Sequence, residues 1–235
     1  MIKERSWLKI LGIDTSSKFL NIALSENKDI IKEGSYLLDR KHASRLVPKI
    51  KELLRKSRVS INKIDAFIIG LGPGSFTGLR IGVSAIKGFC VASEKPCAGV
   101  ASMDAIACNA KENDRDIVPI IDAKRGQVYS AIYQRKGGLV VRLSDYLLLP
   151  IEKLLKKVKR DSVFLGDGVN LYRDKIEGYI NNKRQPAFLP EKYWYPGAGN
   201  LIKLGFSRVK KAKKTNINKL MPLYLYPKDC QVRKP

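Results

Sequence analysis

The 235-residue chain contains a single histidine, His42, and only four cysteines, none of them in a CxxC pair. A metal site with two histidines cannot be built from such a chain, and the cysteines lack the spacing of metal ligands. Long apolar runs are also missing, because none approaches the ~20 residues of a membrane-spanning helix. The short run "ILGI" near the N-terminus is interrupted by Asp14 and is too short for a signal peptide. We therefore expect a cytoplasmic protein with no bound metal and no membrane partner.

Acidic residues are scarce as well. The chain has 22 Asp and Glu against 45 Lys and Arg, which gives a formal net charge of +23. Positive charge gathers in residues 201–235, where Asp229 is the only acid. Clustered cations are typical of proteins that bind nucleic acid, although lysines also serve solubility. The candidate phosphate contacts in this basic tail are Lys210, Lys211, Lys213 and Lys214.

The first half of the chain predicts three strands, then a helix, a strand, a helix, a strand and a short helix. Polar breaks such as "TSSK" and "ENKD" separate the first three strands and suit hairpins. Apolar residues at helical spacing follow in "HASRLVPKIKELLRKS". This order predicts an α/β fold whose sheet opens with hairpins and grows by parallel strands. The predicted strands are 8–14, 19–25, 30–38, 64–70 and 97–102, and the predicted helices are 42–57, 75–92 and 103–110.

The polar stretch "KENDRD" marks a predicted boundary between residues 1–112 and residues 113–235. The second part repeats the order of the first, with three strands joined by turns at "AKRG" and "RKGG". Two halves with the same opening indicate a duplicated architecture, although no repeat of individual residues is visible. The remaining predictions are helices at 150–160, 169–180 and 197–211, a strand at 162–168 and a loop at 182–196.

The stretch "GLGPGSFTGLRIGVS", residues 70–84, invites comparison with phosphate-binding loops. A P-loop closes with Gly-Lys-Ser/Thr, whereas Gly78 here precedes Leu79 and Arg80. A dinucleotide-binding fingerprint requires a glycine where this chain has Ser75. We expect instead a sharp glycine turn that leads into a helix capped by Ser75 or Thr77. Weak anion binding at this helix start would involve Gly72, Pro73, Gly74, Ser75 and Thr77.

The helix predicted at 75–92 has small residues on one face, namely Gly78, Gly82 and Ala85. A helix that is apolar nearly all round is covered on more than one side. Glycines also let a neighbouring helix approach closely. That neighbour is either the helix at 42–57 of the same chain or a helix of a partner protein.

Six motifs together resemble the TsaB family, which takes part in making threonylcarbamoyladenosine in tRNA. They run in order over nearly the whole chain: "LGIDTSS", "KHASRLVPKI", "GLGPGSFTGLRIGVSAIKGF", "DAKRGQVY", "GDG" and "PLYLY". The resemblance implies the fold of actin, Hsp70 and sugar kinases. In that fold two RNase H-like subdomains each combine a mixed sheet with flanking helices.

The resemblance further implies a role without catalysis. Family members form a heterodimer with the catalytic subunit TsaD, chiefly through the first two helices of the N-terminal subdomain, and the ATPase TsaE joins the pair. On this chain the partner interface would comprise helices 42–57 and 75–92. ATP or ADP and metal are expected in the partner subunits, tRNA is met through the complex, and the interface is expected to self-pair when the partner is missing. The interface residues carried over are His42, Arg45, Lys49, Gly78, Arg80, Gly82 and Ala85.

Two departures from the active relatives agree with this implication. ATP-using members of the fold carry an Asp-x-Gly-Thr turn, whereas Asp14 is followed here by Thr15 and Ser16, whose β-carbons crowd a phosphate. The metal site of the catalytic subunit uses an H-x-x-x-H pair, and Leu46 stands four residues after His42.

Two alternatives remain open. One is a nucleotide-binding phosphotransferase of the actin-like group, and the other is an RNase H-like nuclease built around Asp14. Such a nuclease needs several carboxylates at one place to hold two metal ions. Asp65 begins its strand rather than ending it, and Asp122 belongs to the other half. In "DAKRGQVY" the favoured interpretation is a hairpin turn in which Asp122 bonds to nearby backbone, and the alternative is a phosphate or RNA contact by Lys124 and Arg125.

Overall fold

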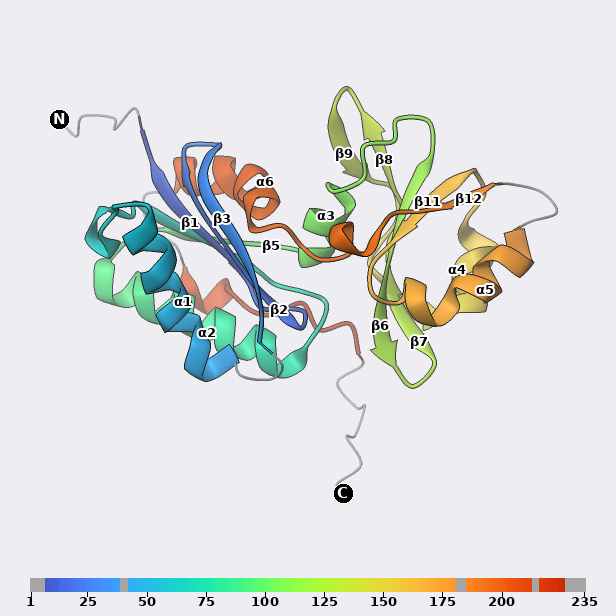
Figure 1. The fold of residues 1–235 in the computed structure, drawn as a ribbon, viewed down its shortest axis with the longest axis horizontal. Helices are drawn as coiled ribbons and strands as arrows, with labels where there is room; N and C mark the ends of the chain where they lie inside the picture. The colour runs from blue at the N-terminus through green and yellow to red at the C-terminus, as the bar shows by residue number, and fades with distance from the viewer. Residues whose placement is uncertain (1–6, 39–41, 181–184, 213–215, 227–235) are drawn as a thin grey trace, which may run out of the picture. The chain divides into compact units, whose positions relative to one another are not determined.

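The computed structural model describes residues 7–38, 42–180, 185–212 and 216–226, and these belong to two compact units (Figure 1). Met1–Asn109 and Tyr195–Pro222 make the first unit. Ala110–Trp194 and Leu223–Pro235 make the second. Each unit has its own sheet with helices against it, as the duplicated α/β pattern predicts.

The first sheet has five strands in the order β3-β2-β1-β4-β5. β1 pairs antiparallel with β2 and parallel with β4, which pairs parallel with β5. The antiparallel pairs come from hairpins, and the parallel ones come from crossovers through α1 and α2. The elements are β1 (Lys9–Asp14), β2 (Phe19–Glu26), β3 (Asp29–Leu37), α1 (His42–Lys56), η1 (Ile61–Lys63), β4 (Ala66–Gly70), α2 (Phe76–Ser93), β5 (Cys97–Val100) and α3 (Ser102–Ala107).

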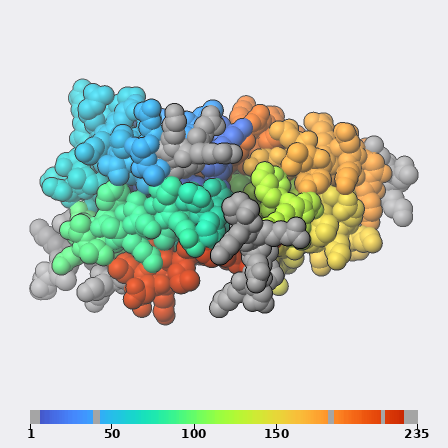
Figure 2. Space-filling model, turned by 90° about the horizontal axis from the view of Figure 1, so that it is seen from below, coloured from blue at the N-terminus to red at the C-terminus, as the bar shows by residue number. Residues whose placement is uncertain are grey.

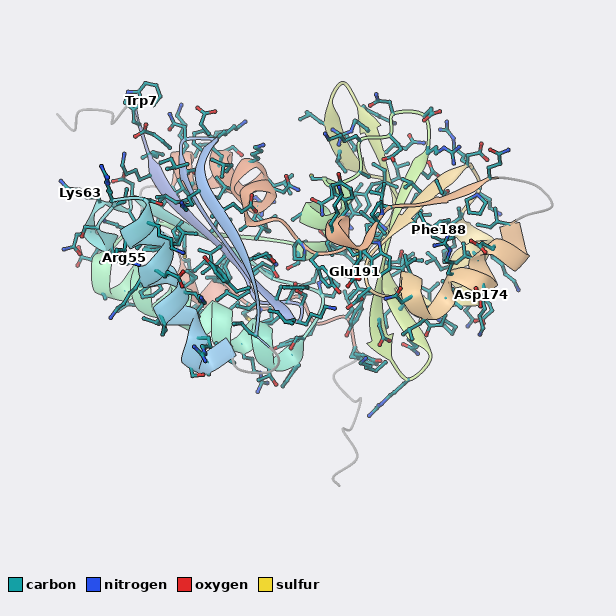
Figure 3. The ribbon with its side chains drawn as sticks, in the orientation of Figure 1. Trp7, Arg55, Lys63, Asp174, Phe188 and Glu191 are labelled. Atoms are coloured by element: carbon teal, nitrogen blue, oxygen red, sulfur yellow. The ribbon has the colours of Figure 1, made fainter. Side chains whose placement is uncertain are left out.

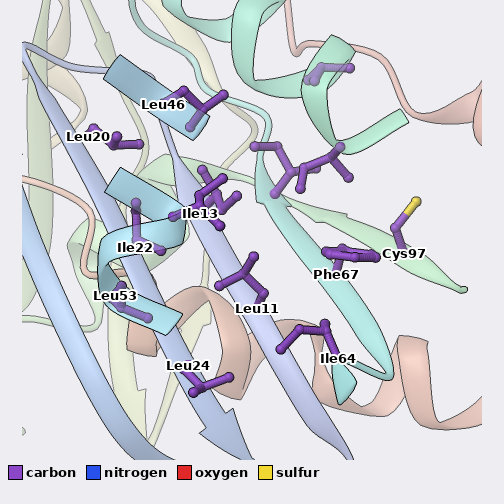
Figure 4. Close-up of a cluster of buried hydrophobic side chains, with 14 of the residues drawn as sticks. Leu11, Ile13, Leu20, Ile22, Leu24, Leu46, Leu53, Ile64, Phe67 and Cys97 are labelled. Atoms are coloured by element: carbon purple, nitrogen blue, oxygen red, sulfur yellow. The ribbon is translucent and has the colours of Figure 1, made fainter. Parts of the chain in front are cut away.

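Both faces of this sheet are covered, so its central strands are buried almost throughout. On one face, Leu46 and Leu53 of α1 pack against side chains of β1 and β2 such as Leu11 and Ile22 (Figure 4). Each of these side chains is at most 2% exposed, and burying one contributes about 1.5–3 kcal/mol. This core fixes α1 and α2 as one layer on the sheet.

The other face is covered by α6 (Ala198–Lys211), which contacts β1, β2, β4 and β5. The sequence interpretation placed everything from 113 to 235 in the C-terminal subdomain, and for residues 195–222 this is wrong. The apolar stripe of α6, which includes Leu201 and Ile202, packs on Ile10 and Ile68 of the first sheet. The polar stretch at 111–116 marked where the chain leaves the first unit, and no comparable signal marks its return.

The second sheet repeats the order of the first, as β10-β7-β6-β11-β12, with β8 and β9 added as a hairpin beside β6. Its central strands β6 and β11 pair in parallel, as β1 and β4 do. The elements are β6 (Asp116–Lys124), β7 (Gln127–Ser130), β8 (Tyr133–Lys136), β9 (Leu139–Arg142), β10 (Leu147–Pro150), α4 (Ile151–Lys157), β11 (Ser162–Leu165), α5 (Val169–Ile180), β12 (Pro186–Phe188), η2 (Glu191–Tyr193) and, in the first unit, η3 (Ile217–Lys219).

Two predictions for this unit are wrong. The three strands predicted between 117 and 149 are five, because β7 gives way to β8 at Ala131 and β9 gives way to β10 after Arg142. The loop predicted at 182–196 contains β12, which completes the sheet by pairing with β11. A three-residue strand beginning at Pro186 has no periodicity to detect, and only its neighbour in space makes it a strand.

Candidate functional site

Asp14 lies at the end of β1, where the chain turns toward β2, and its side chain is fully buried. Oδ1 accepts hydrogen bonds from the backbone N–H and the hydroxyl of Ser16, at 2.8 and 2.6 Å. Oδ2 accepts a hydrogen bond from the hydroxyl of Ser102 at 2.5 Å. Charge-assisted bonds of this kind are the strong ones, and here they commit both carboxylate oxygens to the chain itself.

The glycine loop after β4 lies directly on this turn. Its backbone follows the predicted sharp course, with φ of +90° at Gly72 and +156° at Gly74. Ser75 N–H donates to the carbonyl of Ser16 at 2.7 Å, and Gly72 N–H donates to the Ser102 hydroxyl at 2.9 Å. A Cβ at Gly74 would overlap the Ser16 carbonyl. Glycine is therefore required here for close packing of two backbone segments of the same chain.

The start of α2 is fastened in the same way. Ser75 accepts a hydrogen bond from the Gly78 N–H at 3.1 Å, which confirms the predicted helix cap. With the N–H groups of Gly72, Ser75 and Gly78 occupied internally, fewer donors remain for an anion. The weak anion site at this loop stays a prediction.

Gly78 and Gly82 do not face a helix. Both are buried, and a Cβ at either position would overlap Thr15, at its carbonyl for Gly78 and at Oγ1 for Gly82. The Thr15 hydroxyl also donates to the Gly78 carbonyl at 2.7 Å. The glycine face of α2 thus packs on the β1–β2 turn. The expectations that it receives α1 or a partner helix are wrong, because the spacing of glycines shows a close contact without showing its partner.

The other predicted interface residues lie on the two helices as follows. Arg45 and Arg80 are exposed, whereas Ala85 is half-buried against the first core. His42 is the first residue of α1, and its side chain lies outside the described part of the chain. Lys49 forms an ion pair with Glu52 at 2.7 Å.

Glu52 also pairs with Lys56, at 2.6 Å. Hydrogen bonds from Lys49 and Lys56 hold the pKa of the Glu52 carboxyl at about 2, well below its usual value. The pairs span three and four residues, so they lie along one side of α1 and support the helix.

The exposed sides of α1 and α2 form what we call the α1–α2 surface, defined by Arg45, Val47, Lys51 and Arg55 of α1 and Phe76, Arg80, Ser84, Gly88 and Val91 of α2. The two helices pack side by side and appear together on one face in Figure 2. Arg55 is among the labelled side chains of Figure 3. Val47, Phe76 and Val91 are 41%, 53% and 63% exposed, large values for apolar side chains. A Cβ at Gly88 would meet no atom within 4 Å.

Sequence reasoning missed Gly88 and Val91 as surface residues. The available signal was the spacing of 77, 80, 84, 88 and 91, which follows one side of a helix and includes the polar residues Arg80 and Ser84. Gly82 and Gly88 look alike in the sequence, and only the packing separates them.

In the second unit, Asp122 holds a hairpin turn. Its Oδ1 accepts a hydrogen bond from the Lys124 N–H at 2.8 Å, which confirms the predicted local bond. The Lys124 ammonium group also pairs with Asp122, and this hydrogen bond raises the pKa of Lys124. Lys124, Arg125 and Gly126 all have positive φ, so the turn is tight and left-handed.

Within the described ranges, no group of three or more His, Cys, Asp or Glu side chains is placed to hold a metal ion. Asp65 accepts a hydrogen bond from the Lys9 N–H, at the opposite end of β1 from Asp14. Lys9 and Asp14 are five residue steps apart along the strand, which corresponds to about 16 Å. The carboxylates of the first unit therefore do not gather as a nuclease would require.

The basic tail is described only in part. Lys210 and Lys211 are exposed in the last turn of α6, whereas Lys213 and Lys214 lie outside the described residues. Helices long and apolar enough to cross a bilayer do not occur in the portion that the structure covers.

Comparison with known proteins gives three kinds of match. The sequence model of a family described as TsaD, tRNA N6-adenosine threonylcarbamoyltransferase, matches residues 36–229. The tRNA threonylcarbamoyladenosine biosynthesis protein TsaB of Escherichia coli (strain K12) is 36% identical over 226 residues, which cover 93% of this chain and 94% of that protein.

Among solved structures, a Pseudomonas aeruginosa protein described as similar to the peptidase YEAZ has a TM-score of 0.78 at 24% identity, covering 93% of this chain and 100% of that one. Component A of the (R)-2-hydroxyglutaryl-CoA dehydratase of Acidaminococcus fermentans has a TM-score of 0.52 at 11% identity, covering 87% and 100%. These likenesses concern the fold alone, and they agree with the predicted α/β class, in which each of two units combines a mixed sheet with flanking helices.

Proposed function

This chain belongs to the TsaB family of tRNA threonylcarbamoyladenosine biosynthesis proteins, and from that premise we propose that it is a non-catalytic, activating subunit. It joins a TsaD-like catalytic subunit through the α1–α2 surface, and the pair adds threonylcarbamoyl to adenosine of tRNA. Catalysis takes place in the partner.

The observation that carries the proposal is the closed turn at Asp14. In an active site a carboxylate at this position would turn an oxygen toward a metal or a water. Here both oxygens accept hydrogen bonds from Ser16 and Ser102 at 2.5–2.8 Å, inside a fully buried side chain. The glycine loop fills the space above the turn with backbone. Opening the turn would cost at least the buried hydrogen bonds, about 1–3 kcal/mol each.

The α1–α2 surface supports the partner side of the proposal. It combines apolar side chains, Phe76 and Val91, with cations such as Arg45 and Arg80 around a small centre at Ser84 and Gly88. Small residues allow helices to approach more closely than the usual 8–10 Å between axes. Exposed apolar area with a charged rim is typical of a protein interface.

The remaining partners follow from the same role. A TsaE-like ATPase joins the pair, nucleotide and metal reside in the partner subunits, and tRNA is met through the complex, with Lys210 and Lys211 as candidate contacts. Without its partner, the chain pairs with itself through the α1–α2 surface.

The test is co-elution in size-exclusion chromatography with the TsaD-like subunit of the same organism. Wild type is expected to co-elute at micromolar concentration. Gly88→Leu is expected to weaken the complex by at least about tenfold, because the new side chain holds the facing helix away. Since a Cβ at Gly88 meets nothing within 4 Å, the variant should fold normally.

Gly178→Leu is the matched control. Gly178 is an exposed glycine inside α5 of the second unit, and a Cβ there also meets nothing within 4 Å. It should co-elute like wild type. Separate elution of wild type at matched concentrations, or equal loss in both variants, would contradict the proposal. ATP turnover by the isolated chain would support the phosphotransferase alternative instead.

A further inference from the structure

The second unit has a surface hollow of about 860 Å³ that no sequence motif pointed to. It lies between the C-terminal end of α4 and the connection that follows β9. Ile132, Leu143 and Leu147 contribute its apolar lining. Figure 1 labels α4 and β9, the helix and the strand next to this hollow.

The charged lining of this hollow is almost entirely cationic. Lys156, Lys157 and Lys159 come from α4 and the residues after it, Arg142 comes from β9, and Asp145 is the only acid. The three lysines are exposed, and none takes part in an ion pair among the described residues. Gathering four like charges around one space is unfavourable unless a polyanion offsets the repulsion.

Helix stability does not account for the whole set. Lys156 and Lys157 lie in the last turn of α4, where cations interact favourably with the helix dipole. Lys159 lies beyond the helix, and Arg142 belongs to a strand. Their convergence with the α4 lysines therefore requires a reason other than helix capping.

Arg142 is fixed in place. Its guanidinium group stacks on the ring of Tyr146 at 3.9 Å, and Nη1 donates a hydrogen bond to the Ser144 carbonyl at 3.1 Å. A guanidinium held flat in this way retains donors for a phosphate oxygen and loses less entropy on binding.

The hollow also depends on the β8–β9 hairpin, which the described part of the first unit lacks. α4 takes the place of α1 in the repeated strand order, but the β8–β9 hairpin has no counterpart in the first sheet. Arg142 and Leu143 reach the hollow through this added hairpin. The site is therefore specific to the second unit.

We propose that this hollow binds the phosphodiester backbone of RNA. Four cations around a space of this volume exceed what a single phosphate needs, and they match several phosphates of one strand. A flat bilayer does not enter a hollow, whereas a looped or single-stranded RNA backbone does. The apolar lining offers a place for a sugar or base beside the phosphates.

The test measures binding of a fluorescein-labelled tRNA transcript to the full chain over a series of salt concentrations. Each phosphate contact contributes about −0.7 to the slope of log K against log salt. Four contacts give about −2.8, a loss of about 50-fold between 50 and 200 mM salt. The variant Lys156→Gln/Lys157→Gln/Lys159→Gln removes three contacts, so its slope should be less steep by about 2.

The matched control is Lys32→Gln/Lys63→Gln/Lys203→Gln. It removes the same charge from exposed lysines of the first unit. It should change the slope by less than about 0.5. Both variants should keep the unfolding midpoint of wild type, since all six lysines are exposed.

Four results would overturn the proposal. The first is equal loss of binding in both variants, which would mean that net charge alone attracts the RNA. The second is no binding by wild type up to about 100 µM at low salt, the weak end of non-specific affinity. The third is equal competition by duplex DNA or by free adenosine monophosphate at matched phosphate concentration. The fourth is that phosphatidylglycerol vesicles deplete wild type but not the Lys156→Gln/Lys157→Gln/Lys159→Gln variant, while both proteins bind RNA equally well.

Co-elution with the TsaD-like subunit is expected to be unchanged in both lysine variants. Failure of the RNA proposal is therefore distinct from failure of the proposed heterodimer.

Discussion

Two alanine substitutions on the same helix should have opposite effects on stability. Gly82 of α2 is buried against Thr15, and an added methyl group would overlap Thr15 Oγ1 and stand 3.2 Å from Cδ1 of Ile69. Thr15 is fully buried, and its hydroxyl donates to the Gly78 carbonyl at 2.7 Å. In Gly82→Ala the threonine side chain has to move away, and the hydrogen bond is lost.

The magnitude follows from three contributions. Overpacking of a dense core costs about 1–3 kcal/mol, and a buried hydrogen bond left unmade costs about 1–3 kcal/mol. Replacing a helical glycine by alanine returns about 1 kcal/mol. Gly82→Ala should therefore destabilise the first unit by about 3 kcal/mol. Gly88→Ala gains only the last contribution, because its Cβ meets nothing within 4 Å, and should stabilise by about 0.5–1 kcal/mol.

Urea unfolding followed by circular dichroism measures the difference. With m-values of about 1–3 kcal/mol/M, Gly82→Ala should lower the midpoint by about 1–3 M. Hydrogen exchange of the β1 and β4 amides measures the stability of the first unit. The fluorescence of the buried Trp194 reports on the second unit and should change little. A Gly82→Ala protein as stable as wild type would refute the reasoning, because it would mean that Gly82 is not packed tightly against Thr15.

Three further changes test other parts of the structure. Asp14→Asn should destabilise the isolated chain by about 1–3 kcal/mol in urea unfolding, because the amide NH₂ would face the Ser102 hydroxyl that now donates; lost tRNA modification at unchanged stability would contradict this. Glu52 should titrate near pH 2 in a carbon-detected NMR experiment, and 1 M salt should raise that pKa toward 4.5. Because its pKa is lowered on folding, its contribution to stability is present above pH 4.5 and is lost as the pH falls toward 2. Tyr226→Phe removes the hydroxyl that donates to the Ala123 carbonyl at 2.8 Å, and should lower the stability of the second unit by about 1 kcal/mol, read from Trp194 fluorescence.

Most of the first unit could be predicted from the sequence because its signals are local. Helices expected at 42–57 and 75–92 are observed at His42–Lys56 and Phe76–Ser93. The return of α6 to the first sheet could not be predicted, since its apolar stripe suits any uncovered sheet face. β12 was missed for a related reason, because three residues become a strand only beside β11.

The sequence indicated which types of residue form the candidate site, but it did not indicate which residues they contact. Glycine spacing indicated close packing on α2, and the structure assigns that contact to Thr15. The hollow beside α4 had no signal, because Arg142 and Lys157 converge only through the added hairpin. Charge counts along the chain favoured the tail after 201 and passed over the second unit.

The two units use an aspartate in the same local way, although Asp14 and Asp122 do not occupy equivalent positions in their sheets. Asp14 ends β1 and accepts from the N–H two residues on, that of Ser16, at 2.8 Å. Asp122, near the end of β6, accepts from the N–H two residues on, that of Lys124, also at 2.8 Å. Each such aspartate therefore stabilises its own turn.

A second correspondence follows the next parallel strand. Gly70 and Gly72 come at the end of β4, and Gly166 and Gly168 follow β11. In the first unit the space beside Gly70 holds the Asp14 carboxylate, and in the second Gly166 lies against the Ile120 backbone. In both units these glycines therefore leave room for other atoms of the same chain, a carboxylate in the first unit and backbone in the second.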